Sequence, residues 1–289
     1  MFYQSIRIQI AIITKLINNT KFKIDKGDHL LDTHTHILWN IDDGSKNQCM
    51  SLQMLEIAAR SGTKAIFATP HVIERANKPS WEEIKEKTQQ LRQLCAEAQI
   101  DIMLYPGAEV QMNWELLPEL GATGAYCLNG GRYLLIELPA AEIPAYADEF
   151  WYELELKGIT PILAHPERYQ QLRENPDLLL LWRRRGMLMQ CNSGSFTGMF
   201  GSSVCENAKV LLANGLVDLL GSDGHRSEGR NTDMSRAAAV IRQLAGEEVL
   251  QLTETNPQAI LKNQEIELKQ PKVLLEDKPK SFWQKLFGK

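Results

Sequence analysis

The sequence predicts an α/β fold in which parallel strands curl into a barrel. Short apolar runs typical of strands alternate with longer stretches in which apolar residues recur at helical spacing, the pattern of βα units. Polar side chains able to bind a metal stand where many of the apolar runs end, and the carboxyl ends of barrel strands carry the sites of such folds. Six or seven βα units fit along the chain, which favours a barrel over a two-layer sandwich.

Length and composition agree with one large domain. The chain has 289 residues, of which 44% are hydrophobic, enough for a sizeable core, although two compact domains would also fit this length. The net charge of −4 lacks the basic excess of nucleic-acid binders, so nucleic acid is not an expected partner. The five cysteines form no Cys-x-x-Cys pair, and we expect reduced thiols in a cytoplasmic protein.

The two ends of the chain differ from the middle. Residues 1–28 are expected to form a peripheral extension, because their apolar part is interrupted by Arg7 and Lys15 and falls short of the roughly 20 residues that cross a bilayer. Residues 29–262 are the expected domain, and 263–289 a charged linker and a tail. Aromatic and basic residues interleave over 280–289, which suits peripheral contact with an anionic membrane, docking on a partner, or a loose end.

The elements of the first half follow from periodicity and helix-end signals. Apolar residues recur at helical spacing at Leu52, Leu55, Ala58 and Ala59, and Gly62 then ends the helix. We expect strands over 30–38, 64–69 and 102–105, with helices over 47–61 and 80–98.

The second half repeats the alternation. The apolar run YLLIEL begins it, and LVDLLG provides its last expected strand. We expect strands over 133–138, 160–164, 188–191 and 216–221, with helices over 145–157, 176–185, 203–214, 234–244 and 257–261.

The candidate site residues occupy strand ends. His34 and His36 lie on the same face of the first strand, because alternate residues of a strand point the same way. A single histidine at a strand end is usually a hydrogen-bonded structural residue, but here five of the six histidines belong to such ends. Glu137 lies within an apolar run, where a carboxylate needs a counter-charge. The polar residues at strand ends are His36, His71, Glu109, Glu137, His165, Asn192 and Asp223.

The side-chain types indicate the metal chemistry. Imidazoles and carboxylates without a nearby thiolate favour Mn²⁺, Fe²⁺ or Zn²⁺ over Ca²⁺ or a structural zinc. The ligands are too many for one ion, so two or three ions are expected, and such sites hydrolyse phosphoesters.

Several short motifs carry a resemblance to a known family. The chain resembles the polymerase-and-histidinol-phosphatase (PHP) superfamily, and within it the bacterial manganese-dependent tyrosine-protein phosphatases of capsule and exopolysaccharide operons. The likeness covers roughly residues 29–262. The motifs are His34-x-His36, Asp42-Asp43-Gly44, Ala68-Thr69-Pro70-His71, Gly107-Ala108-Glu109, Ile136-Glu137-Leu138-Pro139, His165-Pro166-Glu167-Arg168-Tyr169 and Ser222-Asp223-Gly224-His225.

The resemblance implies a distorted (β/α)7 TIM-like barrel that holds two or three divalent ions, most commonly Mn²⁺, with Fe²⁺ or Zn²⁺ as alternatives. It implies that Arg168 and Arg230 hold the phosphate, and that Asp43 and His71 take part in catalysis. The chain departs from the commonest family pattern in its long N-terminal extension and at Trp39-Asn40, where Pro-Gly is frequent. The implied metal ligands are His34, His36, Asp43, His71, Glu109, Glu137, His165, Asp223 and His225.

The same resemblance implies a function. It predicts phosphotyrosine hydrolysis by a metal-bridging hydroxide, on the tyrosine-rich tail of a membrane-bound bacterial autokinase that controls polysaccharide synthesis. The enzyme would then work in the cytoplasm, at the inner face of the membrane. The run Arg183-Arg184-Arg185 either helps to recruit an acidic phosphotyrosine cluster or is a solvated helix end.

Four alternatives are weighed against this function. A histidinol-phosphate or other small phosphomonoester phosphatase of the same superfamily is the chief one. A nuclease would want a basic groove, and a binding module would require a decayed site, whereas the ligand set looks complete. A cysteine phosphatase needs Cys-x5-Arg, and Cys127 and Arg132 stand one residue too close together.

Overall fold

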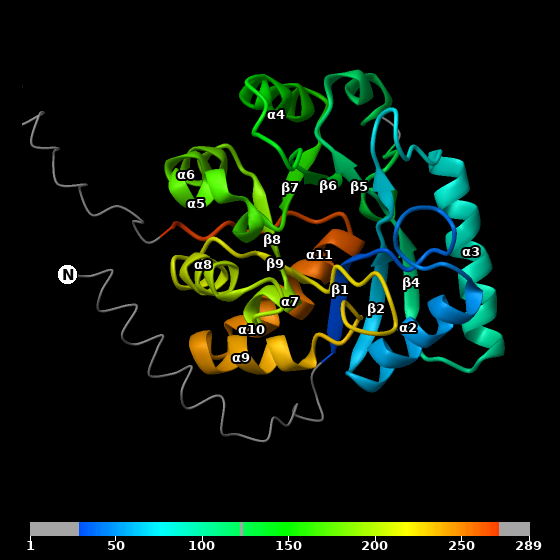
Figure 1. The fold of residues 1–289 in the computed structure, drawn as a ribbon. Helices are drawn as coiled ribbons and strands as arrows, with labels where there is room; N and C mark the ends of the chain where they lie inside the picture. Colours follow the sequence, from blue (N-terminus) through cyan, green and yellow to red (C-terminus); the bar gives the residue numbers. More distant parts are fainter. Residues whose placement is uncertain (1–28, 122–123, 272–289) are drawn as a thin grey trace, which may run out of the picture.

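The computed structural model describes residues 29–121 and 124–271, and the expectations for residues 1–28 and for the tail from residue 280 fall outside this part. Parallel strands occupy the middle of the fold, and helices surround them (Figure 1). The described strands are β1 (Leu30–Thr35), β2 (Thr63–Ala68), β3 (His71–Val72), β4 (Met103–Pro106), β5 (Glu109–Gln111), β6 (Tyr133–Glu137), β7 (Thr160–Ala164), β8 (Leu188–Asn192) and β9 (Leu219–Gly221).

The strands form two hydrogen-bonded sheets, and strands of one sheet lead directly into strands of the other. One sheet has the order β1-β2-β4 and the other β3-β5-β6-β7-β8-β9, with every pair parallel. Two residues separate β2 from β3, and two separate β4 from β5, so each of these pairs is one interrupted strand. Counted in this way, the described chain has seven parallel strands, which confirms the distorted α/β barrel.

Backbone contacts bring the first strand against the last. Thr35 bridges Gly224 in parallel fashion, the His36 N–H donates to the Gly224 carbonyl at 2.9 Å, and the Asp223 N–H donates to the His34 carbonyl at 2.7 Å. The residues that follow β9 are thereby fixed beside the histidines of β1.

The two longest helices begin at side chains that cap their free backbone N–H groups. Asn47 accepts from the N–H of Met50 at 2.9 Å, and Ser80 accepts from the N–H of Glu83 at 3.1 Å, which explains why the first two helices begin there. The described α-helices are α2 (Gln48–Arg60), α3 (Trp81–Glu97), α4 (Ala147–Leu156), α5 (Gln170–Glu174), α6 (Asp177–Arg184), α7 (Ser193–Phe196), α8 (Ser202–Ala213), α9 (Ser235–Ala245), α10 (Glu248–Leu250) and α11 (Asn256–Leu261).

Three 3₁₀ segments and one π-helical segment complete the secondary structure of the described residues. The π-helical segment joins α10 to α11 without a break, so the last helix runs on from residue 248 to 261. The four segments are η1 (Trp114–Glu119), η2 (Leu128–Gly130), η3 (Pro166–Arg168) and η4 (Gln251–Thr255).

The structure corrects the predicted bounds of several elements. The strand expected over 30–38 ends at Thr35, because the chain then turns over the His36 side chain and returns to it at Gly44. A Cβ on Gly44 would overlap the His36 carbonyl oxygen, so only glycine permits this approach. The strand expected over 216–221 begins at Leu219. The short helices α5, α7 and α10 and the strands β3 and β5 were not expected as separate elements.

The departure at Trp39-Asn40 fits the observed turn. Asn40 adopts φ 51°, in the left-handed region that asparagine tolerates better than most residues. The ring of Trp39 is nearly buried, and the ammonium of Lys87 lies 5.0 Å from its centroid and 3.1 Å from its carbonyl oxygen.

Strand alternation divides the buried residues between the barrel interior and the helix layer. In β6, Tyr133 and Leu135 belong to the small inner core, whereas Leu134 and Ile136 belong to the larger core that packs against the helices. Glu137 continues the inward series of Tyr133 and Leu135. The barrel is therefore apolar at the amino ends of its strands and polar at their carboxyl ends.

The described chain continues past the last helix. Residues 264–271 run without helix or strand across the amino ends of the barrel strands, where Ile266 is 8% exposed and packs in the inner core. The carbonyl of Gln264 accepts a hydrogen bond from the hydroxyl of Tyr133 at 2.5 Å. Among the described helices, none has the length and apolar character needed to cross a bilayer.

Candidate metal centre

Strand β1 positions two histidines of the site, His34 and His36. All six residues of this strand are buried, because sheet neighbours and helices cover both of its faces. His34 and His36 lie on the inward side, two residues apart, and their Nε2 atoms approach to 3.1 Å. Neither side chain is exposed. A Cβ at Gly221 would lie 2.5 Å from the Cβ of His34, so the glycine that ends β9 leaves room for this imidazole.

Each of these imidazoles is oriented by a neighbour that binds its other nitrogen. His36 Nδ1 lies 2.7 Å from the Asp42 carboxylate, and His34 Nδ1 lies 2.9 Å from the Gln190 amide oxygen. A donor at Nδ1 leaves the Nε2 lone pair free, the arrangement typical of metal-binding histidine. Asp42 also accepts from the backbone N–H groups of His71 and Gly44, at 2.9 Å each.

Glu109 lies at the centre of the cluster. It begins β5 and is 1% exposed. Its Oε2 atom lies 3.1 Å from His34 Nε2, 3.2 Å from His36 Nε2 and 3.1 Å from His71 Nδ1. Its Oε1 atom lies 2.8 Å from His165 Nε2. This carboxylate therefore contacts four imidazoles, which belong to β1, β3 and β7 or to the residues that directly follow these strands.

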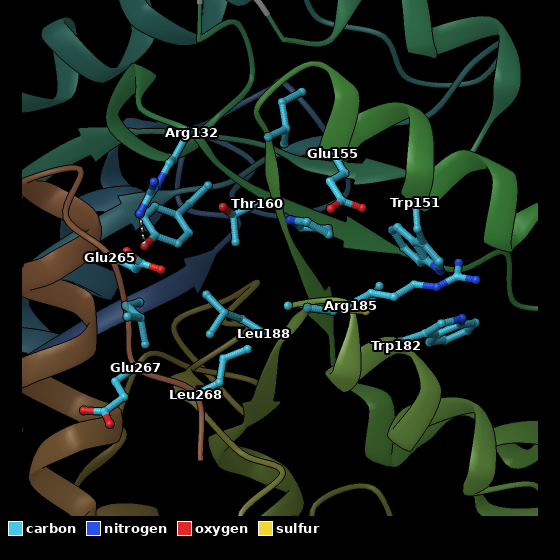
Figure 2. A pocket seen from close by; sticks show the side chains of 16 residues that line it. Arg132, Trp151, Glu155, Thr160, Trp182, Arg185, Leu188, Glu265, Glu267 and Leu268 are labelled. Atoms are coloured by element: carbon cyan, nitrogen blue, oxygen red, sulfur yellow. Dashed lines mark hydrogen bonds between the residues drawn. The ribbon is translucent and has the colours of Figure 1, made fainter. Parts of the chain in front are cut away.

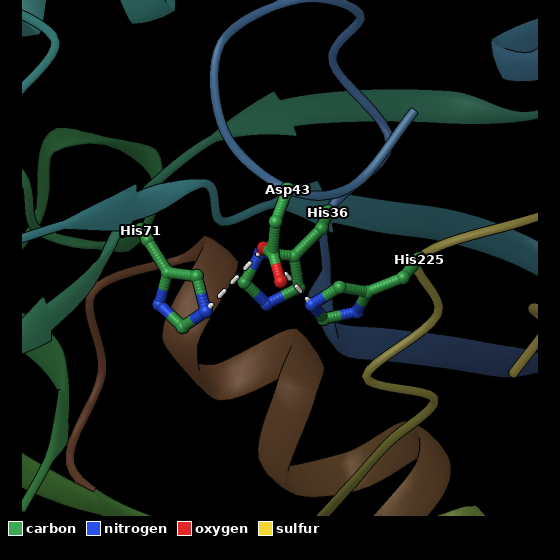
Figure 3. Close-up of side chains that lie close together, drawn as sticks. All are labelled: His36, Asp43, His71 and His225. Carbon is green, nitrogen blue, oxygen red and sulfur yellow. Dashed lines mark ion pairs between the residues drawn. The ribbon is translucent and has the colours of Figure 1, made fainter. Parts of the chain in front are cut away.

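A second group of side chains lies toward the mouth of the barrel (Figure 3). Asp43, His71 and His225 approach each other there, with Asp43 Oδ1 3.3 Å from His225 Nε2 and 3.7 Å from His71 Nε2. Asp43 is 68% exposed, so it stands at the rim, whereas His225 is buried. His71 Nδ1 also lies 3.3 Å from Glu137, which joins this group to the deeper one.

Asp223 faces the histidines with one oxygen and three donors with the other. Its Oδ1 atom lies 3.5 Å from His34 Nε2 and 3.4 Å from His36 Nε2. Its Oδ2 atom accepts from Asn192 at 2.5 Å, from Arg168 at 3.1 Å, and from Arg230. The carboxylate thus links the cluster to both arginines.

Two residues of the site have left-handed backbones. His165 adopts φ 36° and Asp223 adopts φ 51°, each directly after or close after a strand. Such conformations are unfavourable for residues other than glycine and are concentrated at functional sites. They turn both side chains toward the barrel axis as the chain leaves the sheet.

Burial and mutual attraction set the protonation of the cluster. Burial lowers the pKa of His34 and His36, but nearby carboxylates outweigh it and raise both values, that of His36 strongly through Asp42. Burial raises the pKa of Glu109 and Asp223, but the facing imidazoles hold both well below the usual range. His225 differs: burial and the neighbouring His36 lower its pKa to about 4. The cluster therefore balances its carboxylates with protonated imidazoles, and cations that displace those protons would bind with a pH-dependent affinity.

The donor set fits divalent ions. Five buried atoms of the cluster's imidazoles and carboxylates have no hydrogen-bond partner among the described residues: His71 Nδ1, Glu109 Oε2, His165 Nδ1, Asp223 Oδ1 and His225 Nε2. All of them except His165 Nδ1 lie at ion-pair distance from others of the set. Buried polar atoms without a partner are rare and costly. Three groups have ligand atoms close enough to share an ion: His36, Asp43, His71 and His225; His34, His36 and Asp223; His71, Glu109 and Glu137.

The structure thus brings together the residues proposed as ligands and phosphate-binding groups, gives the strand-end residue Asn192 a role beside them, and adds two residues that the sequence did not assign to the site. Asp42 and Gln190 orient histidines, and Asn192 holds Asp223. Asn192, the last residue of β8, was expected at a strand end, and Asp42 carried a weak signal because it stands beside Asp43 in the sequence. Nothing in the sequence distinguishes Gln190 from an ordinary buried strand residue.

The cluster opens into a cavity of about 760 Å³. Besides the site residues, it is lined by the loop over residues 138–143 and by the segment over 168–174. A different cavity, of about 640 Å³, lies at the other end of the barrel, where Tyr133, Thr160 and Leu188 begin their strands (Figure 2). Its described lining contains tryptophans, arginines and glutamates but no histidine, so it offers no comparable metal site.

Comparison with known proteins places these features in one family. Residues 30–262 match the family described as "Capsular polysaccharide synthesis, CpsB/CapC". The chain is 33% identical over 237 residues to the tyrosine-protein phosphatase YwqE of Bacillus subtilis, covering 82% of this chain and 93% of that protein. It is 28% identical over 241 residues to the tyrosine-protein phosphatase CpsB of Streptococcus pneumoniae, covering 81% and 99%.

A solved structure agrees with the sequence relatives. It comes from work on the crystal structures of YwqE from Bacillus subtilis and CpsB from Streptococcus pneumoniae, described as unique metal-dependent tyrosine phosphatases. The TM-score is 0.79 at 32% sequence identity, and the match covers 86% of this chain and all of the other. The barrel and the order of its elements are therefore shared with that phosphatase.

Proposed function

Because the chain belongs to the CpsB/CapC family of capsular polysaccharide synthesis, we propose that it is a metal-dependent protein-tyrosine phosphatase. The observation that supports this most directly is the buried cluster of imidazoles and carboxylates whose partnerless atoms face one another, with two arginines directly behind it. Such a site combines metal binding with phosphate binding in one cavity.

We propose that nine residues hold two or three divalent ions. His36 and His71 each belong to two of the three close groups, so the three groups adjoin one another. His165 joins the set through its contact with Glu109. Mn²⁺ is the proposed ion, with Fe²⁺ and Zn²⁺ as alternatives that the same donor types accept. The proposed ligands are His34, His36, Asp43, His71, Glu109, Glu137, His165, Asp223 and His225.

The chain's own residues prepare the site for a phosphoryl group. The bound ions would supply Lewis-acid polarisation and activation of a water at neutral pH. Arg168 and Arg230 stand at the edge of the cluster with planar guanidinium groups that match phosphate oxygens, and the buried Nε of Arg230 has no partner among the described residues. Asp42 and Gln190 hold the tautomers of His36 and His34. Asp43 and His71, at the rim, are proposed to take part in the hydrolysis of the bound phosphoester.

The cysteine whose spacing comes nearest to the thiol-phosphatase motif, Cys127, offers no competing nucleophile. Burial raises the pKa of the Cys127 thiol to about 12, so it does not ionise at neutral pH. Arg132 lines the cavity at the opposite end of the barrel and donates to the hydroxyl of Tyr133. The pair Cys127 and Arg132 therefore lacks both the thiolate and the placement that a thiol phosphatase needs.

The substrate is proposed to be a phosphotyrosine segment of a tyrosine autokinase in capsule or exopolysaccharide synthesis. The family membership supports the process, and the open cavity of about 760 Å³ leaves room for a side chain carried on a peptide. Phenolate is a good leaving group, with a pKa near 10, so weak protonation of it suffices. Contact with a membrane through residues 280–289 and a cytoplasmic location complete the proposal. A histidinol-phosphate phosphatase is the alternative.

The test is phosphatase activity of the purified full chain on a phosphotyrosine peptide, on para-nitrophenyl phosphate and on histidinol phosphate. We expect activity with added Mn²⁺, none with EDTA, a preference for the peptide, and little inhibition by vanadate at concentrations that stop thiol phosphatases. Faster turnover of histidinol phosphate than of the peptide would favour the alternative. No release of phosphate from any of the three esters with Mn²⁺, Fe²⁺ or Zn²⁺ would overturn the proposal.

A further inference from the structure

An aromatic ring lies against both arginines of the site. The Cζ atom of Arg168 is 4.8 Å from the ring centroid of Phe200, and the Cζ atom of Arg230 is 5.7 Å from it. The three residues come from separate segments: Arg168 from η3 after β7, Phe200 from the turn between α7 and α8, and Arg230 from the loop after β9. One ring thus contacts two cations that approach from different parts of the barrel rim.

The turn that carries Phe200 is held firmly. Gly198 and Gly201 bracket it with φ of 84° and 92°, which glycine adopts without strain. The N–H of Met199 donates to the Gly194 carbonyl at 2.9 Å. A Cβ on Gly194 would lie 3.0 Å from the Phe200 ring and 2.9 Å from the Met199 sulfur, so the turn packs directly against this glycine.

The same buried carboxylate supports the turn and the Arg168 segment. Glu167 has no exposed surface, and its Oε1 atom accepts from the Ser195 hydroxyl at 2.6 Å and from the Asn192 N–H at 2.9 Å. Arg168 follows Glu167 directly, and α7, which contains Ser195, leads into the Phe200 turn. The ring and the first arginine are therefore fixed relative to each other.

The arginines need such support because little else orders them. Their side chains are 33% and 29% exposed, and both donate to the same oxygen of Asp223. Two guanidinium groups converging on one oxygen repel each other, and long side chains lose rotamer freedom when they are fixed. The negative face of an aromatic ring offsets both costs.

We propose that Phe200 is a positioning residue that holds Arg168 and Arg230 as a preformed pair for the phosphoryl group, an inference that rests on the proposed phosphatase function. The ring contacts no metal ligand by any described interaction and acts through the arginines. Preorganised donors bind their anion more tightly, because their ordering precedes binding. Loss of the ring is therefore expected to weaken phosphate binding more than it slows turnover.

The test compares Phe200→Leu, which keeps apolar volume without an aromatic face, with Phe200→Tyr, which keeps the face. Affinity for inorganic phosphate is measured by calorimetry on the Mn²⁺-loaded full chain, and KM and kcat on para-nitrophenyl phosphate. For the leucine variant we expect phosphate affinity and 1/KM to fall about tenfold, with kcat within about threefold. The tyrosine variant should restore both to within about threefold of the unaltered protein. Met199→Leu, on the same turn, is the matched control and should change neither value.

A coupling measurement separates this role from a structural one. Phe200→Leu is also made in the chain that carries both Arg168→Ala and Arg230→Ala, where it should lower kcat/KM by less than twofold. A leucine effect as large in that background, or unchanged phosphate affinity in the single variant, would overturn the inference. Thermal melting checks each fold, and Phe200→Met replaces the leucine variant if that one melts early. If the unaltered chain binds phosphate and cleaves no ester, the proposed function fails, whereas an active chain unaffected by Phe200→Leu refutes only the positioning role.

Discussion

The barrel contains two buried charged clusters, and they differ in whether the protein satisfies them. Near β8 and β9, Arg183 and Asp218 are 3% and 4% exposed and form a two-pronged pair, with N–O distances of 2.7 and 2.9 Å. At the mouth of the barrel, Glu109 and Asp223 are as deeply buried, but each keeps one oxygen without a hydrogen-bond partner. In the first cluster the two charged groups satisfy each other, whereas the second is arranged for groups that the polypeptide does not provide.

The remaining contacts of the pair reinforce this difference. Asp218 Oδ2 also accepts from the Met189 N–H at 2.8 Å, and Arg183 donates to the Gly215 carbonyl at 2.9 Å. Among the polar atoms of these two side chains, only Arg183 Nε lacks a partner within the described structure. Deep burial of charge therefore does not by itself mark a functional site. The distinguishing sign is several partnerless atoms that face a common region.

The largest expected effect tests the unsatisfied cluster. Glu109→Gln keeps the shape of the side chain but removes the charge that four imidazoles surround. We expect kcat/KM on a phosphotyrosine peptide to fall at least about 10³-fold, roughly 4 kcal/mol in the barrier, because the proposed metal site would lose the charge of its central carboxylate. The midpoint of thermal unfolding without metal should stay close to that of the unaltered chain, and added Mn²⁺ should raise it only in the unaltered chain.

The buried acid of the other cluster is the control for this variant. Asp218→Asn, measured in the same assay, should leave the activity of the folded protein unchanged and should keep the stabilisation by Mn²⁺. Activity of Glu109→Gln within threefold of the unaltered chain would show that the mouth cluster is not the catalytic centre.

The second prediction concerns stability, for which a substitution in the Arg183–Asp218 pair is expected to have a larger effect than a substitution in the cluster at the mouth. Asp218→Asn leaves the buried Arg183 cation without its counter-ion, and breaking a buried pair in this way costs about 3 kcal/mol or more in the free energy of unfolding. Urea unfolding of the metal-free protein measures this loss. Replacing both partners by apolar residues, Arg183→Met with Asp218→Leu, should recover most of it, because no unpaired charge remains. A loss below about 1 kcal/mol in the single variant would mean that solvent reaches the pair.

The comparison also shows what the sequence could and could not predict about the two clusters. Asp218 lies within the apolar run over 216–221, and Asp223 lies two residues past its end. Only the partner that each meets in the fold separates a structural from a site carboxylate. Arg183 was expected in an exposed basic run, as a recruiting or solvated residue. The structure corrects this, since its guanidinium is inside the protein and only Arg184 and Arg185 of that run are exposed.

Much of the fold and of the site was accessible from periodicity. The βα alternation predicted the barrel because the spacing of apolar residues and the polar residues at strand ends can both be recognised in a single sequence. The interrupted strands β3 and β5 were missed because two or three residues carry no measurable period. The histidines and most carboxylates of the proposed site were singled out by their place at strand ends, and Asp43, Arg168 and Arg230 by the family resemblance. Gln190 and Phe200 are instead proposed to act through contacts between segments distant in the chain.

The smallest expected effect concerns the boundary of the unsatisfied cluster. Asp42 is not a proposed ligand, but its carboxylate lies 2.7 Å from His36 Nδ1 and fixes which nitrogen is left for an ion. Asp42 accepts from the N–H groups of Gly44 and His71 through different oxygens, so Asp42→Asn keeps one of these two hydrogen bonds and loses the charge that holds the His36 proton. We expect the Mn²⁺ concentration for half-maximal activity to rise roughly 10- to 100-fold, with kcat at saturating Mn²⁺ within about threefold of the unaltered value.

A metal titration of activity measures this shift, and Asp101→Asn is the matched control, because that exposed acid pairs with Lys64 away from the cluster. The control should leave the titration unchanged. If Asp42→Asn also leaves it unchanged, strand β1 alone orients His36, and the organised region of the site ends at its proposed ligands. If kcat at saturating Mn²⁺ falls as steeply as in Glu109→Gln, Asp42 belongs to the unsatisfied cluster itself, and the division between ligands and the residues that orient them has to be redrawn at this position.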